Sequence, residues 1–132
     1  MTLNINLSEH FKLSEFIHTN VPNGIQSNID YLRENFEVFL PRLRRLVNVL
    51  EKVRSFCGTP VCVTSGLRSP FVNLQVGGVR NSKHQFALAS DIAINLKWDL
   101  TKIKLYLDGL CDSDYVDYYY INQQKKYIHI QI

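Results

Sequence analysis

Long apolar stretches are missing from this sequence. No run of about eighteen apolar residues, the length needed to cross a membrane, occurs in it. Its opening residues, MTLNINLSEHFKLSEF, lack the basic flank and the unbroken apolar stretch of a secretory signal. We therefore expect no membrane span, and synthesis in the cytoplasm without a signal peptide.

An excess of charge of either sign is also missing. The 132 residues include 15 Lys and Arg against 12 Asp and Glu, which gives a net charge of +3. Proteins that bind nucleic acid usually carry a dense basic face. The charge balance therefore disfavours nucleic acid as a partner.

Cysteine is scarce, and its spacing does not indicate a disulfide framework. The three residues Cys57, Cys62 and Cys111 are odd in number and lack CxxC spacing. This usage suits reduced thiols in a cytosol better than a set of disulfides. We expect the three side chains to pack as small buried hydrophobic groups.

Repeats, low-complexity tracts and linkers rich in Ser and Gly are absent as well. Hydrophobic residues make up 45% of the chain, which is enough for one core at this length. We expect a single domain over residues 1–132, and a monomer.

Helical spacing of apolar residues dominates the first part of the chain, up to Gly58. The spaced residues are Leu40, Leu43, Leu46, Val47, Leu50 and Val53. Pro41 lacks a backbone N–H, so we expect a new helix or a kink there. The basic cluster Arg42, Arg44 and Arg45 fits a solvated helix face, with a phosphate-binding patch as the alternative.

The middle of the chain departs from regular patterning. A short strand is predicted over residues 61–64, followed by about thirty residues with little helical period. Loops of that length in compact domains are often functional. The segment closes with a strand over residues 87–94, in which Asp91 shares its face with alanines only. Such small neighbours leave room for an ion beside the carboxylate.

The last part of the chain predicts a helix and a β-hairpin. Asp99 or Thr101 caps the helix, and the two strands cover residues 115–121 and 127–132. Ile128 and its alternating neighbours face one way, so His129 points off the apolar face. The tyrosines at 118–120 fit a half-buried sheet, or alternatively a stacking platform.

Three side chains suggest a metal site. His84, Asp91 and His129 offer two imidazoles and one carboxylate, a set that suits zinc and leaves a fourth position open. Taken without their sequence context, these three residues are weak evidence for a metal site, because single histidines and aspartates usually lie at the surface or have hydrogen-bond partners of their own.

The residues around them strengthen the signal. The string SKHQFALASD at 82–91 closely resembles the SxHxxGxAxD motif of the zinc D-alanyl-D-alanine peptidases, which cleave peptidoglycan and include D,D-carboxypeptidases and phage endolysins. Upstream, TSGLRS at 64–69 is similar to the family's SGYRS segment, and 72–82 matches its vN..vGGv.nS pattern. Downstream, YIHI at 127–130 stands where the family has its WxHxs strand. The opening LSEHFKLSEF resembles the family's leading segment, so the match spans nearly the whole chain.

The resemblance implies a function and a site. It implies that His84, Asp91 and His129 bind one zinc ion, and that Arg68 and Ser82 bind a peptidoglycan stem peptide. A guanidinium can hold the carboxylate of a terminal D-alanine through two parallel hydrogen bonds. The implied fold is α+β, of the zinc D,D-peptidase (hedgehog-like) type, with N-terminal helices packed against a small, mainly antiparallel sheet.

Two positions depart from the family pattern. Ala87 replaces a glycine, and if φ is positive there the β-carbon costs about 1 kcal/mol or more. The acidic general base of the family is expected at Lys126 or roughly at Asn122, and neither is acidic. Asp117 lies five residues before Asn122 on the same predicted strand, an odd offset that directs it to the opposite face.

Two functions follow from this reading. The first is zinc-dependent hydrolysis of D-alanine-containing peptide bonds in peptidoglycan, as in a phage-type endolysin that reaches the wall after release. Without the base, hydrolysis is expected to be slow or absent. The second is a catalytically silent, zinc-binding relative that serves as a wall-binding or virion structural module.

Overall fold

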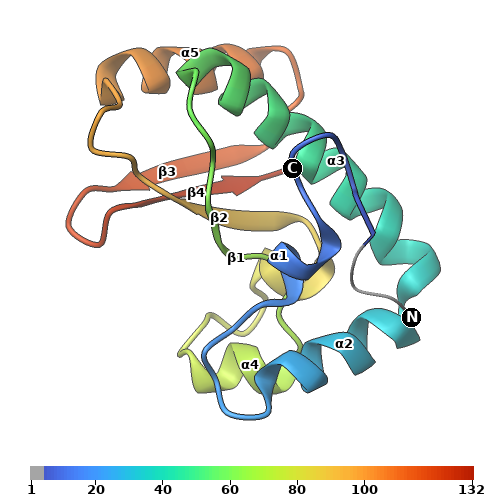
Figure 1. Cartoon of the computed structure of the whole chain (residues 1–132). Coiled ribbons are helices and arrows are strands. Elements are labelled where there is room, and N and C mark those ends of the chain that lie inside the picture. The colour runs from blue at the N-terminus through green and yellow to red at the C-terminus, as the bar shows by residue number, and fades with distance from the viewer. Residues whose placement is uncertain (1–4) are drawn as a thin grey trace.

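A four-stranded antiparallel sheet forms the centre of the molecule (Figure 1). The structure, a computed structural model, describes residues 5–132, so the first four residues of the segment considered for a secretory signal lie outside it. The strands are β1 (Val63–Ser65), β2 (Ala89–Ala93), β3 (Tyr118–Asn122) and β4 (Tyr127–Gln131). Their order in the sheet is β1-β2-β4-β3, and every neighbouring pair is antiparallel.

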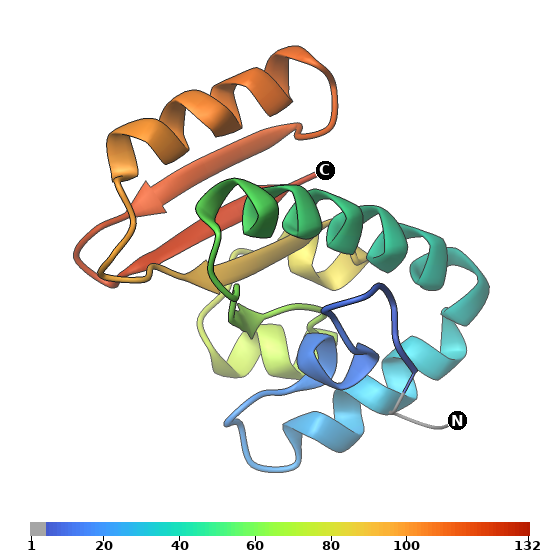
Figure 2. The ribbon, with the colours of Figure 1, turned by 45° about the horizontal axis from the view of Figure 1, so that its top comes forward.

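Helices surround this sheet. They are α1 (Leu13–Ile17), α2 (Gly24–Glu34), α3 (Phe36–Cys57), α4 (Pro70–Gln75), the 3₁₀ helix η1 (Lys83–Phe86) and α5 (Leu100–Asp112). Figure 2 shows α3 and α5 over one face of the sheet, with α1, α2 and α4 gathered beyond its β1 edge. The architecture is therefore α+β, as expected. None of the helices within residues 5–132 has the length and apolar character required to cross a membrane.

The face of the sheet under α3 and α5 is the apolar one. Ile92 of β2 pairs with Ile128 of β4, and both side chains are fully buried. They belong to one core cluster with Leu50 of α3 and Leu107 of α5. Each such buried side chain contributes about 1.5–3 kcal/mol of hydrophobic stabilisation. Because strand residues alternate, the intervening residues of β2 and β4 face away from this core.

The helices bear on two expectations. Of the new helix or kink expected at Pro41, the new helix is not found, because α3 continues through Pro41 from Phe36 to Cys57. The middle segment is also less irregular than predicted, since it contains α4 and η1. Helix α4 begins where the Ser69 hydroxyl accepts a hydrogen bond from the Val72 N–H, with Pro70 in the first helical position. Six residues are too few to show a helical period, so only this cap could have indicated the helix.

The cysteine expectation is partly wrong. All three thiols are free, as expected, but Cys62 is exposed and Cys57 and Cys111 are only half-buried. Cys62 precedes β1 directly and points away from the core. The three side chains therefore do not act as fully buried hydrophobic groups.

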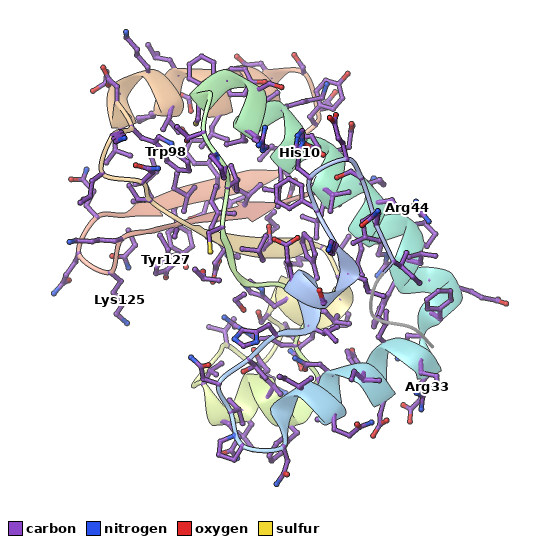
Figure 3. The ribbon with its side chains drawn as sticks, in the orientation of Figure 1. His10, Arg33, Arg44, Trp98, Lys125 and Tyr127 are labelled. Atoms are coloured by element: carbon purple, nitrogen blue, oxygen red, sulfur yellow. The ribbon has the colours of Figure 1, made fainter. Side chains whose placement is uncertain are left out.

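The two sides of the sheet carry different aromatic residues. Figure 3 shows Trp98 on the side of α5 and Tyr127 on the opposite side. Trp98 packs against the core cluster and donates a hydrogen bond through Nε1 to the Thr59 hydroxyl, at 2.7 Å. Tyr127 lines a cleft on the face of the sheet that α3 and α5 do not cover.

Candidate metal centre

Three chain segments bring His84, Asp91 and His129 together. Asp91 of β2 and His129 of β4 are direct partners in the antiparallel register, so their side chains share the face that α3 and α5 leave uncovered. Helix η1 carries His84 to the same place. One ligand atom from each residue lies within 4.8 Å of the other two, and all three residues are buried or nearly so.

The outer nitrogen of each histidine has its own acceptor. Nδ1 of His84 lies 2.8 Å from the carbonyl oxygen of Gly66, which can only accept, so this nitrogen carries the hydrogen. Nε2 of His129 lies 3.2 Å from Oε1 of Gln131. These contacts direct the other nitrogen of each ring at the carboxylate of Asp91. His84 Nε2 lies 3.3 Å and His129 Nδ1 lies 2.8 Å from Oδ1 of Asp91.

This donor set fits a metal ion. Two imidazole nitrogens and one carboxylate oxygen are all electron-pair donors, and they can converge so closely only around a proton or a metal cation. Three ligands with an open fourth position are typical of catalytic zinc. The second hydrogen bond made by each ring is also the usual support of a metal-binding histidine.

The carboxylate of Asp91 is held in its charged form. Burial alone would raise its pKa, but hydrogen bonds from His129 and His84, together with their charge, lower the pKa well below its ordinary value. A carboxylate that is ionised at neutral pH is the form that binds a metal ion.

Local backbone structure fixes the position of His84. The Ser82 hydroxyl caps η1 by accepting a hydrogen bond from the His84 N–H at 3.3 Å. The helix ends at Ala87, whose φ of 57° and ψ of 33° are left-handed. The backbone at Ala87 thus has the positive φ that was considered for this position, and the β-carbon there costs about 1 kcal/mol or more.

Arg68 lies beside the metal centre and is held from three directions. Its Nε donates to the Ser65 hydroxyl at 3.1 Å, and one terminal nitrogen donates to Oδ1 of Asn73 at 3.4 Å. The other terminal nitrogen is 3.6 Å from Oδ2 of Asp91. Gly78 makes this arrangement possible, because a β-carbon there would lie 2.1 Å from the Asn73 oxygen.

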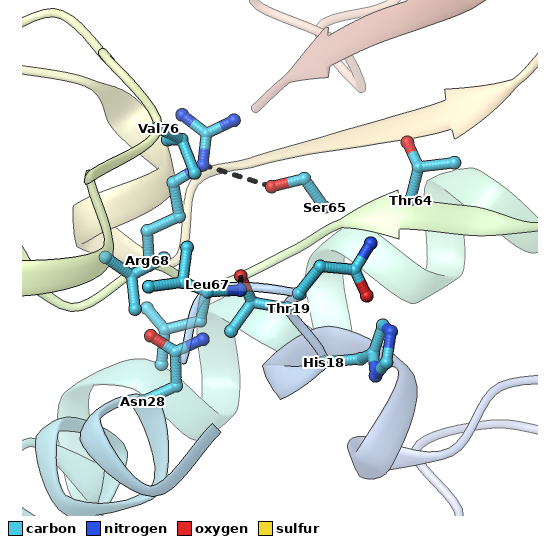
Figure 4. Close-up of a pocket in the computed structure, with 11 residues that line it drawn as sticks. His18, Thr19, Asn28, Thr64, Ser65, Leu67, Arg68 and Val76 are labelled. Atoms are coloured by element: carbon cyan, nitrogen blue, oxygen red, sulfur yellow. Dashed lines mark hydrogen bonds between the residues drawn. The ribbon is translucent and has the colours of Figure 1, made fainter. Parts of the chain in front are cut away.

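Two cavities meet at Arg68. A cleft of about 540 Å³ contains the metal centre and is bounded by residues 76–79, η1 and the tyrosines of the hairpin. A second cavity of about 440 Å³ lies between residues 18–21 and β1. Arg68 and Val76 line both, and Figure 4 shows the hydrogen bond from Arg68 to Ser65 at their boundary. Ser82, which the resemblance assigns to substrate binding, lines the cleft.

The tyrosines at 118–120 divide between the two faces of the sheet. Tyr119 faces α5 and hydrogen-bonds through its hydroxyl to Asp108. Tyr120 is the register partner of His129 and stacks on its ring, with centroids 4.9 Å apart and planes at 17°. Its hydroxyl is 3.0 Å from that of Tyr127. Tyr120, one of the tyrosines considered for a stacking platform, and Tyr127, which the sequence did not indicate for this role, thus form a wall of the cleft.

The positions expected for an acidic base lie away from the cleft lining. Asn122 ends β3, and its side-chain oxygen accepts a hydrogen bond from the Lys125 N–H at 2.9 Å. Lys126 is exposed in the same turn with a φ of 60°. Among the cleft-lining residues in the described part of the chain, Asp91 is the only carboxylate. Outside the cleft lining, the carboxylate of Asp117 accepts a hydrogen bond from Nε2 of Gln131 at 3.3 Å.

Comparisons with known proteins agree with the motifs. No curated protein matches the chain. The family model described as Peptidase M15 matches residues 9–131, which is nearly the whole chain. The α+β fold, with its antiparallel sheet and the His84, Asp91 and His129 cluster, is consistent with that match. The chain belongs to the peptidase M15 family, the zinc D-alanyl-D-alanine peptidases whose motifs its sequence resembles.

Proposed function

We propose that this protein is a zinc peptidase that hydrolyses D-alanine-containing peptide bonds in peptidoglycan. The observation that carries the proposal is the convergence of two imidazole nitrogens and one carboxylate oxygen within 4.8 Å, beside a guanidinium. His84, Asp91 and His129 would hold one zinc ion. When bound, zinc polarises a scissile carbonyl and makes a water molecule more acidic.

Arg68 would bind the substrate carboxylate. Its side chain is only 17% exposed, and contacts with Ser65 and Asn73 hold the guanidinium at the boundary of the cleft. A planar guanidinium pairs with a carboxylate through two parallel hydrogen bonds. A stem peptide that ends in D-alanine presents such a carboxylate next to the bond that is cleaved.

Ser82 and the tyrosine wall would complete the binding of the peptide. Ser82 lines the cleft while its hydroxyl caps η1, so it couples the position of His84 to the cleft surface. Tyr120 and Tyr127 present hydroxyl groups on the opposite wall. These hydroxyl groups can donate to peptide carbonyl oxygens.

Slow turnover is part of the proposal. Peptide hydrolysis needs a group that accepts the proton of water and passes it to the leaving amine, and losing it removes about 10²- to 10⁴-fold of the rate. Asp91 is the only carboxylate that lines the cleft among residues 5–132, and its role there is metal binding. The same observation favours a second candidate, a zinc-binding relative that binds peptidoglycan or serves in a virion without cleaving.

One experiment distinguishes the two candidates. The zinc-loaded protein is incubated with purified peptidoglycan and with a D-Ala-D-Ala peptide, and released D-alanine and cleaved cross-links are measured. Slow, zinc-dependent release that is absent in an Arg68→Ala variant supports the peptidase. Binding to peptidoglycan without any release, by protein that contains about one zinc per chain, supports the silent relative. Wild-type protein that takes up no zinc contradicts both.

A further inference from the structure

Three side chains form a line from the edge of the sheet to the metal centre. Nε2 of Gln131 donates to Oδ2 of Asp117 at 3.3 Å. Oε1 of the same amide lies 3.2 Å from Nε2 of His129. Nδ1 of His129 lies 2.8 Å from Oδ1 of Asp91. No sequence motif pointed to Gln131, and strand alternation argued against Asp117.

The chemistry of these groups sets the direction of each contact. An ionised carboxylate can only accept hydrogen bonds, so Asp117 must face the NH₂ end of the Gln131 amide. The carbonyl end of that amide then faces His129, and it also can only accept. Nε2 of His129 therefore carries a hydrogen, which leaves Nδ1 as the nitrogen available to a metal.

We propose that Gln131 and Asp117 are positioning residues for the metal centre. Gln131 fixes Nδ1 of His129 as the metal-binding nitrogen, and Asp117 fixes the orientation of the Gln131 amide. This inference rests on the proposed zinc site. It assigns no contact between Gln131 or Asp117 and substrate.

The two histidines are held in different ways. The outer nitrogen of His84 meets a backbone carbonyl, that of Gly66, which no side-chain substitution removes. The outer nitrogen of His129 meets a side-chain amide whose two ends differ only in hydrogen-bonding character. An amide can rotate by half a turn and present NH₂ instead of oxygen. A second group must therefore select the orientation, and Asp117 is placed to do so.

Backbone contacts keep Asp117 beside Gln131. The Asp117 N–H donates to the Gln131 carbonyl at 2.8 Å, directly before β3 begins. Gln131 pairs with Tyr118 in the register and lines the cleft, half-buried, on the same face as His129. Asp117 itself is exposed, so solvent weakens its hold on the amide. We therefore expect Gln131 to matter more than Asp117.

Zinc affinity is the first measurement, made by competition with a chromogenic chelator. Loss of a hydrogen bond to the outer nitrogen of a metal-binding histidine typically weakens affinity by about 10- to 100-fold, which is the effect expected for Gln131→Met. Asp117→Ala should weaken affinity less, by several-fold. Gln123→Met and Asp112→Ala, at exposed positions outside the line, serve as matched controls and should bind zinc like the wild type.

A double substitution tests the selecting role of Asp117. In Gln131→Glu, either carboxylate oxygen can accept from Nε2 of His129, so no orientation has to be selected. In Gln131→Glu the second carboxylate oxygen also faces Asp117 and repels it. The weakening caused by Asp117→Ala should therefore be absent or reversed in the Gln131→Glu background. A purely structural role for Asp117 predicts the same loss in both backgrounds.

Nitrogen NMR of the histidine rings gives a readout that does not depend on activity. In the zinc-loaded wild type, His129 should show a protonated Nε2 and a metal-bound Nδ1, and Gln131→Met should lose the slowly exchanging Nε2 hydrogen. Thermal melting of the metal-free variants shows whether they fold. Gln131→Met that binds zinc within about twofold of the wild type, with the ring signals unchanged, overturns this inference while the proposed function stands. Absence of zinc from the wild type overturns both.

Discussion

The two faces of the sheet use the same strands for different purposes. On the face under α3 and α5, Ile92 and Ile128 pair across β2 and β4 and are fully buried. One residue away on each strand, Asp91 and His129 pair on the cleft face. On each strand, the residue that stabilises the core and the residue that faces the cleft are thus immediate neighbours in the sequence.

The faces differ in what they require of a side chain. The helix-covered face needs apolar groups of suitable volume, and other apolar residues can meet that need. The cleft face needs particular atoms at particular positions, and a hydrogen-bonding partner holds each of these side chains. Gly66 holds His84, Ser65 and Asn73 hold Arg68, and Gln131 holds His129. Substitutions on the helix-covered face should therefore lower the free energy of unfolding, whereas substitutions on the cleft face should lower zinc or substrate binding.

The largest difference is expected between neighbours on β4. Ile128→Ala removes a fully buried side chain and should lower the free energy of unfolding by about 2–5 kcal/mol, with about one zinc per chain retained. His129→Ala should lose the zinc but keep the fold, because it removes a ligand and leaves the core intact. Chemical denaturation and elemental analysis of both variants test this contrast. Equal zinc content in wild type and His129→Ala would remove the ligand assignment.

The next prediction concerns the rate of hydrolysis. Tyr120, rather than Asn122, is the residue of β3 that lies opposite His129. A carboxylate introduced by Tyr120→Glu should raise the rate on a D-Ala-D-Ala peptide by about 10²-fold, through general-base assistance. Asn122→Glu is the matched control and should leave the rate near the wild-type value. A larger gain from Asn122→Glu, with zinc content equal in both variants, would contradict this assignment.

A smaller effect is expected at Gly78. The β-carbon of Gly78→Ala would lie 2.1 Å from Oδ1 of Asn73 and 3.2 Å from a terminal nitrogen of Arg68, so both side chains must move. Losing one charge-assisted contact to the substrate should weaken peptide binding by about tenfold, as measured by calorimetry or KM. Gly109→Ala, whose β-carbon meets nothing within 4 Å, is the control. Unchanged peptide affinity in Gly78→Ala would show that Arg68 is not positioned through Asn73.

The smallest effect is expected at Ala87. Ala87→Gly relieves the left-handed strain, but it also removes a fully buried methyl group and adds backbone entropy to the unfolded chain. These terms oppose one another, so the free energy of unfolding should change by less than about 1 kcal/mol.

Ala89 supplies the comparison for that measurement. It is also fully buried but lies in β2 with ordinary backbone angles, so Ala89→Gly gains nothing from strain relief. Urea denaturation should show Ala89→Gly to be the less stable variant by about 1 kcal/mol. Equal stability of the two variants would mean that Ala87 is not strained.

Strand alternation was sufficient to predict much of the site. It directed Asp91 and His129 away from the apolar residues of their strands, and the register makes them direct neighbours. The resemblance to SxHxxGxAxD marked Ala87 as a glycine position, and the structure gives it the positive φ that glycine adopts readily. These features depend on local pattern, and local pattern is readable from one sequence.

The register of the hairpin could not be predicted in the same way. A turn over residues 122–126 would pair 121 with 127 and bring Tyr119 opposite His129. The observed turn is one residue shorter and pairs Asn122 with Tyr127, so Tyr120 faces His129 instead. A shift of one residue moves every side chain of a strand to the other face. The geometry of the turn decides between the two registers, and the amino-acid composition of the turn does not specify that geometry.

The strand order β1-β2-β4-β3 also bears on how the molecule folds. The β3–β4 hairpin is local in sequence, but β4 must insert beside β2, where Asp91 and His129 are 38 residues apart. Pairings between distant segments close large loops and tend to form slowly. Asp91 and His129 can therefore come together only when the hairpin pairs with β2. A metal ion bound there would link the hairpin to β2. Its binding free energy would then oppose the separation of the hairpin from β2.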